Sequence, residues 1–325
     1  MRKIKDYKIP KYRVKQKDLI PKKTIRYRMA HYLATEASFY PIPGLTNTSL
    51  LDKKCTTMVP QGICTCENYT LTTAYDSEGI HLSAIYVLEN NSLIATLVYD
   101  NKSHLGGIAY DGSYIWVAEG GGSAHGDEMG AIKKEDFFSA IKMCIESKAE
   151  SIQLANIIRL RAKELKYTSF CSYHDGILWA GHFSAKTTSH IYGYKACEEN
   201  GQLSITPVRY IEAPMKTQGI CFYAHEDTTY LGVSTSYGRR NNSVFRCYKL
   251  KNYNNPSDTY ENIPQIRKNS AYRTIILPSM SEQICVKDNT IYCIFESAAY
   301  KYLRNSSRPI GSYCIFDAEK VFLSC

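Results

Sequence analysis

The sequence has no long hydrophobic run. No apolar stretch approaches the 18 or so residues that a membrane-spanning helix needs. The first 28 residues also lack the apolar core of a secretory signal peptide. We therefore expect no transmembrane segment and a cytoplasmic protein, or a secreted one from which a signal has been removed.

Short catalytic and metal-binding motifs are also missing. The chain contains no G-x-S-x-G elbow, no H-E-x-x-H and no Cys–His signature. Its 12 cysteines are scattered, and Cys64 and Cys66 form a C-x-C with no second pair at zinc spacing. Most of them lie in apolar, strand-like runs, where cysteine behaves as a small hydrophobic residue. We expect the cysteines to be buried free thiols in a reducing compartment. No short motif identifies a reaction for this protein.

Acidic residues are scarce at the N-terminus. Residues 1–28 hold 12 Lys or Arg against two Asp, a net charge of +10, so the rest of the chain carries −1 of the total +9. We predict a basic extension over residues 1–37 and a nearly neutral domain over 38–325. The extension is either a solvated tail or an arm that binds an anionic partner such as a membrane surface, a nucleic acid or an acidic protein.

The chain repeats one kind of segment five times. Each copy begins with small or polar residues, enters a short apolar strand, breaks at a polar turn such as Asp111-Gly112 or Asp175-Gly176, and leaves through a second apolar strand. Tyrosine, at 27 residues against 10 Phe and 2 Trp, also favours strands. The five copies are PQGICTCENYTLTTAY (60–75), GGIAYDGSYIWVAE (106–119), TSFCSYHDGILWAGH (168–182), TQGICFYAHEDTTYLGVSTS (217–236) and SEQICVKDNTIYCIFE (281–296).

Further strand-like segments follow most of these hairpins. Four antiparallel strands recurring about every 45–65 residues are typical of a β-propeller, in which the innermost strand of each blade lines a central channel. We therefore predict an all-β fold, a five-bladed β-propeller. We expect CTTMVP (55–60) to supply the missing outer strand of the fifth blade and so close the ring.

One segment departs from this pattern. Between residues 127 and 166, Phe137, Ile141 and Ile145 recur at helical spacing with charges between them. We predict a helical insertion in the second blade. It either covers a blade edge or acts as a lid or partner-binding helix.

These patterns resemble bacterial five-bladed β-propeller proteins of the YVTN, NHL and gluconolactonase-like type. The resemblance is carried by the PQG opening, HLGGIAYDG (104–112), STSYGRRNNS (234–243) and FESAAYKY (295–302), and it spans roughly residues 38–322. The strands that open with QG and the late glutamate also make the chain similar to plant-type glutaminyl cyclases. The resemblance implies the fold and no particular reaction, because a fold does not by itself define an activity.

The repeat predicts a polar funnel at one end of the channel. If equivalent positions converge there, two rings of side chains form, one where the first strands begin and one where the second strands end. The first ring is Gln61, His104 or Leu105, Thr168, Gln218 and Glu282, and the second is Tyr75, Glu119, His182, Ser236 and Glu296.

These residue types allow acid–base chemistry. Glu119, Glu282 and Glu296 are candidate catalytic residues, because adjacent carboxylates shift each other's pKa. His104 and His182 are suited to proton transfer, or to holding a divalent metal ion together with a carboxylate. The predicted substrate-binding residues are Gln61, Tyr75, His104, His182, Gln218, Tyr237, Arg239 and Lys301, with Arg239 and Lys301 placed to neutralise an anionic group.

Two classes of function remain open. The first is a ligand-binding propeller, as a hydrolase or lyase acting on a small polar or glycan-like molecule in the funnel. The second is a non-catalytic propeller that binds a protein or surface through its rim or basic arm. The same charged residues also fit a network of salt bridges that fixes the blades. No cofactor is identified beyond the divalent metal ion that the histidines would allow.

Overall fold

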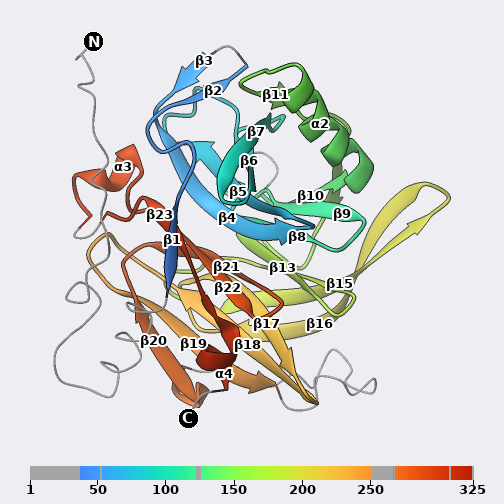
Figure 1. The fold of residues 1–325 in the computed structure, drawn as a ribbon. Coiled ribbons are helices and arrows are strands. Elements are labelled where there is room, and N and C mark those ends of the chain that lie inside the picture. The colour runs from blue at the N-terminus through green and yellow to red at the C-terminus, as the bar shows by residue number, and fades with distance from the viewer. Residues whose placement is uncertain are drawn as a thin grey trace.

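The computed structural model describes residues 37–51, 53–121, 126–250, 266, 268–306 and 309–323. Residues 1–36, which include the basic segment 1–28 interpreted as either a solvated tail or an arm for an anionic partner, lie outside the described residues. The described chain forms a five-bladed β-propeller, which confirms the predicted fold class (Figure 1). Each blade contains four antiparallel strands, of which the first is innermost.

The first two blades share an added helix and strand. In blade 1, the short strand β11 pairs in parallel with β7, and in blade 2 the chain leaves the sheet between β10 and β12. Their elements are β4 (Met58–Cys66), β5 (Tyr69–Asp76), β6 (Ala84–Glu89), β7 (Ser92–Val98), β8 (Gly107–Tyr110), β9 (Tyr114–Ala118), β10 (Glu128–Lys133), α2 (Lys134–Glu146), β11 (Ile152–Gln153) and β12 (Ile158–Arg161).

Blades 3 to 5 follow the simple four-strand plan. The β15–β16 hairpin extends well beyond the other strands (Figure 1). The elements are β13 (Phe170–His174), β14 (Ile177–Gly181), β15 (Ser189–Glu199), β16 (Gln202–Ala213), β17 (Thr217–His225), β18 (Thr228–Thr235), β19 (Ser243–Leu250), η2 (Lys268–Ser270), β20 (Arg273–Leu277), β21 (Ser281–Lys287), β22 (Thr290–Phe295), α3 (Tyr300–Leu303), β23 (Ser312–Asp317) and α4 (Ala318–Phe322).

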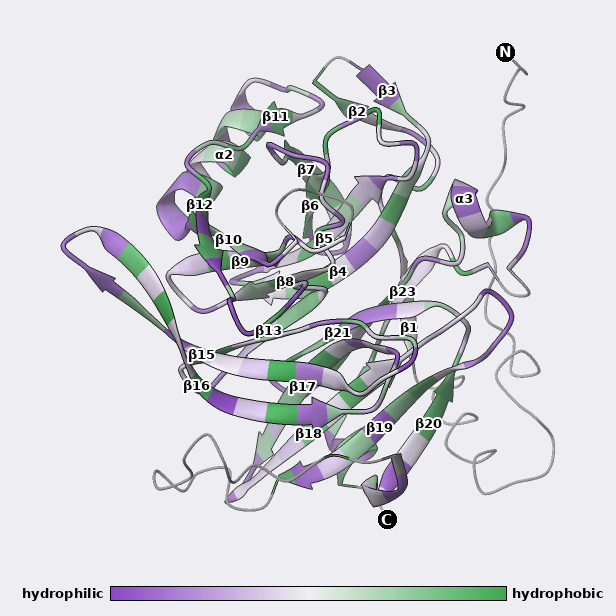
Figure 2. Cartoon of the chain, turned by 180° about the vertical axis from the view of Figure 1, so that it is seen from behind, coloured by the Kyte–Doolittle hydropathy of each residue, from purple (hydrophilic) through white to green (hydrophobic). Residues whose placement is uncertain are grey.

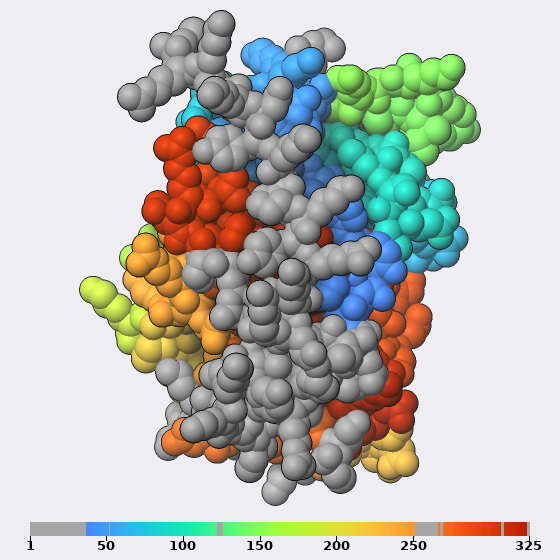
Figure 3. All heavy atoms as spheres, turned by 60° about the vertical axis from the view of Figure 1, so that its left-hand side comes forward, coloured from blue at the N-terminus to red at the C-terminus, as the bar shows by residue number. Residues whose placement is uncertain are grey.

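The ring closes differently from the prediction. The outer strand of blade 5 is β1 (Ser38–Pro41), which pairs antiparallel with β23 from Ser38 opposite Ile315 to Pro41 opposite Ser312. Figure 3 shows the blue N-terminal residues against the orange and red residues of this blade. The prediction that residues 55–60 close the ring is wrong, because Met58–Pro60 already belong to the inner strand of blade 1 and pair with β5.

A short hairpin links the closing strand to blade 1. It consists of β2 (Thr48–Leu50) and β3 (Lys53–Cys55), and it lies in the chain between β1 and β4. Two-residue turns connect several pairs of successive strands. Asp175-Gly176 and Asn200-Gly201 have positive φ at both positions (51° and 73°, then 51° and 77°), which is the type I′ geometry that matches strand twist.

The helical insertion is shorter than predicted. Residues 128–133 form strand β10, and the α-helix occupies only Lys134–Glu146 of the predicted 127–166. Its buried residues Phe137, Ile141 and Cys144 pack with strand residues of blades 1 and 2. The helix therefore covers the outer face of the junction between these two blades.

The core consists of five hydrophobic clusters, one at each junction between neighbouring blades. Figure 2 shows hydrophobic residues in green alternating with hydrophilic ones along the strands, as the two-residue strand period requires. Trp116 and Trp179, one in the second strand of blade 2 and one in that of blade 3, are fully buried. All the described cysteines are free thiols, and only Cys197 among them is exposed.

Candidate functional site

A cavity of 460 Å³ opens where the first strands of the blades begin and the second strands end. Residues from all five blades or their connections contribute to it. Its wall is formed by Gln61, Tyr75, His104, Gly106, Gly120, Gly121, Tyr167, Ser169, Phe183, Gln218, Glu282, Glu296 and Tyr302.

Three of the polar residues lie at irregularities in the inner strands. The register shifts between Pro60 and Ile63 in β4, between Thr217 and Gly219 in β17, and between Ser281 and Ile284 in β21. Such bulges redirect side chains that would otherwise alternate across the sheet. They explain how Gln61, Gln218 and Glu282 reach the cavity.

Two glutamates form a hydrogen-bonded pair in the wall. Glu282 and Glu296 bond through their carboxyl groups. The pair is capped at both ends by amides: Gln218 Nε2 donates to Glu282 Oε1 at 3.1 Å, and Gln61 Nε2 donates to Glu296 Oε2 at 3.2 Å. The four side chains thus form one array across blades 1, 4 and 5.

Burial makes this pair bind a proton tightly. It raises the pKa of Glu282 well above the ordinary carboxyl value, and the neighbouring Glu296 charge raises it further. Burial also raises the pKa of Glu296, to about 7, against the lowering effect of its hydrogen bonds and of Lys301 and Arg239. Two carboxylates in contact do not both ionise readily, so the pair loses its first proton near pH 7, from Glu296, and above that pH holds one proton, with Glu282 as the acid.

The part of the site beside Glu296 is aromatic and cationic. Tyr75 and His104 stack with ring centroids 3.9 Å apart. Lys301 Nζ donates to the Tyr75 hydroxyl at 3.1 Å and lies 5.3 Å from the Tyr302 ring centroid, while the Arg239 guanidinium lies 5.1 Å from the same centroid. Burial, and secondarily Lys301, lowers the pKa of His104 to about 4, so its imidazole is neutral at pH 7.

The structure brings six of the eleven predicted site residues into the cavity wall: Gln61, Tyr75, His104, Gln218, Glu282 and Glu296. Lys301 and Arg239 are not part of the wall but contact two of its residues, Tyr75 and Tyr302 respectively. Tyr237 is 51% exposed and stacks on Phe183 at the rim. His182 does not line the cavity and instead stacks on His190.

Glu119 is the one predicted catalytic residue that is absent from the wall. Its side chain is completely buried between blades 1 and 2. Oε1 accepts a hydrogen bond from the Tyr99 hydroxyl at 2.6 Å, and Oε2 accepts one from Asn101 Nδ2 at 2.7 Å and pairs with Arg159 Nε at 3.2 Å. These contacts give Glu119 a structural role and leave it no place in the cavity chemistry.

Sequence reasoning overlooked Tyr167 and Ser169 in the cavity wall, and also Gln283, which lies deeper in the channel. Gln283 Oε1 accepts hydrogen bonds from the backbone N–H of Ile63 and Ile108, both at 2.9 Å, and its Nε2 donates to the carbonyls of Ile108 (2.7 Å) and Cys171 (2.8 Å). The side chain thereby joins blade 5 to blades 1, 2 and 3. A second cavity of 310 Å³ is lined by Gln283 and by residues from the other ends of the inner strands.

Glycine makes room for Gln283 in the neighbouring inner strands. A Cβ at Gly62 would lie 2.9 Å from Gln283 Oε1, and one at Gly219 would lie 2.8 Å from Gln283 Cα. The repeat could have revealed Gln283, because the fifth copy has EQI, with Gln283 at the position of the glycine in the QGI of the first and fourth copies. A large polar residue where other copies of a repeat have glycine is expected to occupy the space that the neighbouring glycines leave open.

Comparisons with known proteins give no family. No protein-family model matches the chain, and no curated protein matches it by sequence. The resemblance to YVTN, NHL and gluconolactonase-like proteins therefore stays a prediction beyond the five-bladed propeller itself. Among the described residues, no helix is long and apolar enough to cross a membrane.

Solved structures match the chain at low sequence identity. A GH43_1 enzyme from Xanthomonas citri is 10% identical with a TM-score of 0.47, over 88% of this chain and 91% of that one. The Bacteroides ovatus protein "Xyloglucan PUL GH43B" is 11% identical with a TM-score of 0.42, and the match covers 79% of this chain but only 49% of the other. The WD40 β-propeller domain of Doa1 is 10% identical, with a TM-score of 0.39, over 89% and 100%. None of these values transfers an activity to this chain.

Proposed function

We propose that the 460 Å³ cavity binds a small polar or glycan-like molecule and that the Glu282–Glu296 pair performs acid–base chemistry on it, as in a hydrolase or lyase. The observation that carries this proposal is the array Gln218, Glu282, Glu296 and Gln61 in the cavity wall. Its two carboxyl groups differ in protonation, and groups of this kind in a cleft favour a functional role.

We assign a separate role to each glutamate. Glu296, as the carboxylate, accepts a proton from water or from a C–H group of the substrate. Glu282, as the carboxylic acid, donates its proton to the departing oxygen, so a bond to that oxygen breaks as the new bond or double bond forms. Proton transfer from Glu296 back to Glu282 along their hydrogen bond restores the starting state.

The spacing of the pair argues against a standard glycosidase mechanism. The carboxyl groups of glycosidases lie about 5–5.5 Å apart in retaining enzymes and about 6.5–9.5 Å apart in inverting ones. Glu282 and Glu296 are instead in direct hydrogen-bond contact. The pair therefore fits an elimination, or hydrolysis of a bond such as a lactone ester, better than displacement at a sugar's anomeric carbon.

The remaining wall residues suit a polar ligand. The stacked Tyr75 and His104 rings present flat surface, and Tyr302 lies beside the cations Lys301 and Arg239. These two cations favour a ligand with an anionic group, such as a sugar acid.

The test is a ligand screen followed by matched variants. Purified protein is screened by thermal shift against sugars, sugar acids and lactones, with binders then assayed for turnover. Glu296→Gln keeps the shape of the side chain, so we expect the fold to persist and turnover to fall about 100- to 10,000-fold. Glu226→Gln, an exposed change, is the control and leaves turnover unchanged.

The pH profile tests the assigned roles. Turnover rises as the pH approaches about 7, because Glu296 must ionise while Glu282 stays protonated. Unchanged turnover in Glu296→Gln would contradict the proposal. Binding without turnover of any compound would instead support a non-catalytic binding propeller.

A further inference from the structure

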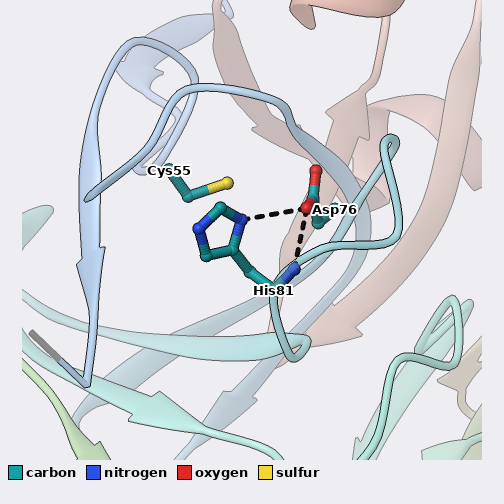
Figure 4. Close-up of side chains that lie close together, drawn as sticks. All are labelled: Cys55, Asp76 and His81. Atoms are coloured by element: carbon teal, nitrogen blue, oxygen red, sulfur yellow. Dashed lines mark hydrogen bonds and ion pairs between the residues drawn. The ribbon is translucent and has the colours of Figure 1, made fainter. Parts of the chain in front are cut away.

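A second group of reactive side chains lies beside the segment that closes the ring. Cys55 ends strand β3, Asp76 ends β5, and His81 lies in the loop that leads to β6. Their Sγ, carboxylate and ring-nitrogen atoms all lie within 4.8 Å of one another. Figure 4 shows the three side chains converging from these separate segments. The cavity described above does not use them.

The carboxylate of Asp76 is held in a fixed orientation. Oδ1 accepts hydrogen bonds from the Thr57 hydroxyl at 2.5 Å and the Glu78 N–H at 3.1 Å. Oδ2 accepts from the backbone N–H groups of Ile80 and His81, both at 2.9 Å, and contacts His81 Nδ1 at 3.0 Å. Outer hydrogen bonds of this kind orient the ligands of metal sites.

This carboxylate is also a buried negative charge. The Asp76 side chain is completely buried, and the hydrogen bonds that its carboxylate accepts from Thr57 and from the loop to His81 favour the ionised form. Among the described residues, His81 is the only basic side chain that forms an ion pair with it. A buried charge is costly unless it is paired or bound to a metal ion.

We propose that Cys55, Asp76 and His81 bind a divalent transition-metal ion, with zinc as the best match. Thiolate, imidazole and carboxylate together are typical zinc ligands. Zinc bonds of about 2.0–2.3 Å in a tetrahedron place ligand atoms about 3.3–3.6 Å apart. The three donors therefore need to close by only about 1 Å, and the thiol proton of Cys55 leaves for solvent when the metal binds.

Solvent access provides the fourth ligand. The His81 side chain is 13% exposed, so water can reach this edge of the group. Cys55, in contrast, is only 1% exposed and lines neither of the two cavities. This placement favours a metal ligand over a nucleophile that must meet a substrate.

The site would fasten the closing segment to blade 1. Cys55 belongs to the β2–β3 hairpin, which follows the ring-closing strand β1, whereas Asp76 ends β5 and His81 lies in the connection from β5 to β6. A metal ion that bridges them links the two parts independently of the backbone pairing. The proposal does not depend on the function of the large cavity.

The test uses the full chain and Co²⁺ as a spectroscopic substitute for zinc. We expect one equivalent of Co²⁺ to produce a thiolate-to-cobalt charge-transfer band that added Zn²⁺ abolishes, and Zn²⁺ alone to raise the melting temperature. Cys55→Ser removes the band. His81→Gln, at a partly exposed side chain, weakens Co²⁺ affinity about tenfold or more.

Cys197→Ser is the matched control, because Cys197 is the exposed thiol of the described chain and the most accessible competing ligand. It keeps the band and the affinity. The proposal is wrong if the wild type shows no thiolate band, if Cys55→Ser keeps it, or if Cys197→Ser loses it. If Cys55→Ser does not fold, as judged by circular dichroism, His81→Gln decides: unchanged affinity in that variant overturns the site.

Discussion

Glu119 and Glu296 occupy the same position in two blades but have different surroundings. Each follows the second strand of its blade, β9 in blade 2 and β22 in blade 5. Glu119 is completely buried and is paired with Arg159. Glu296 faces the cavity, and its nearest ionisable neighbour in the array is another carboxyl group, Glu282. One glutamate is neutralised by a cation and the other shares a proton.

The difference lies in the partners of each glutamate, which for Glu119 come from outside the repeat and for Glu296 from within it. Arg159 comes from the outer strand β12, after the helical insertion, and Tyr99 follows the last strand of blade 1. Blade 5 places Glu282 at the bulge where blades 1 and 4 have glutamine. Equivalent positions in a repeat thus predict where a side chain lies, whereas its partners decide whether it stabilises the fold or stays available for chemistry.

Removing Arg159 tests the structural role of Glu119 and has the largest expected effect. Arg159→Met leaves a buried carboxylate without its ion pair, so we expect the free energy of unfolding to fall by about 3–5 kcal/mol. Chemical denaturation measures it. Arg161→Met, on the same strand but 64% exposed at its side chain, changes stability by less than about 1 kcal/mol.

The double variant Arg159→Met with Glu119→Leu sharpens the result. Because it removes both charges, it recovers part of the lost stability. A single Arg159→Met variant as stable as the wild type would show that Glu119 does not depend on this ion pair.

Gln283 provides the next largest effect. Gln283→Leu leaves backbone groups of Ile63, Ile108 and Cys171 without their partners in the channel, and we expect a loss of about 3 kcal/mol in unfolding free energy. Gln202→Leu, at an exposed strand position, is the control. Equal stability of the two variants would contradict the bridging role of Gln283.

Much of the fold was predictable from the sequence because its repeat is local. The turns at Asp111-Gly112 and Asp175-Gly176 mark hairpins within single blades, and the five hairpins correspond to the five blades. The ring-closing strand Ser38–Pro41 was missed because its partner, β23, is more than 270 residues away in the chain. The helix was overextended because residues 128–133, although adjacent to it, pair with β9.

The candidate site was predictable to the extent that the repeat positions converge. Gln61, Gln218, Glu282 and Glu296 follow from equivalent positions in their blades. The Cys55, Asp76 and His81 group could not be found in this way, because Cys55 precedes the first repeat and no local spacing links it to His81.

Titration of Glu296 sharpens the chemical half of the comparison. Its pKa in the folded protein, about 7, exceeds the ordinary 4.5, so the folded state binds the proton more tightly. Stability from this group is therefore lost as the pH rises from about 4.5 through 7. Glu296→Gln removes this pH dependence. We therefore expect the free energy of unfolding of the variant, relative to that of wild type, to be about 2 kcal/mol higher at pH 7 than at pH 5. Denaturation at each pH measures it. An unchanged pH dependence would show that Glu296 does not hold this proton.

His104 has the smallest expected effect and the opposite sign. Its folded pKa, about 4, lies below the ordinary 6.5, so the unfolded state binds the proton more tightly and wild-type stability is lost as the pH falls from about 6.5 towards 4. His104→Phe keeps a ring on Tyr75 and removes this loss. We expect the variant to be about 1–2 kcal/mol more stable than wild type at pH 5, relative to the difference at pH 8. If the stability difference is the same at both pH values, His104 is not held as a neutral imidazole in the folded protein. The difference in protonation within the cavity then depends on Glu282 and Glu296 alone.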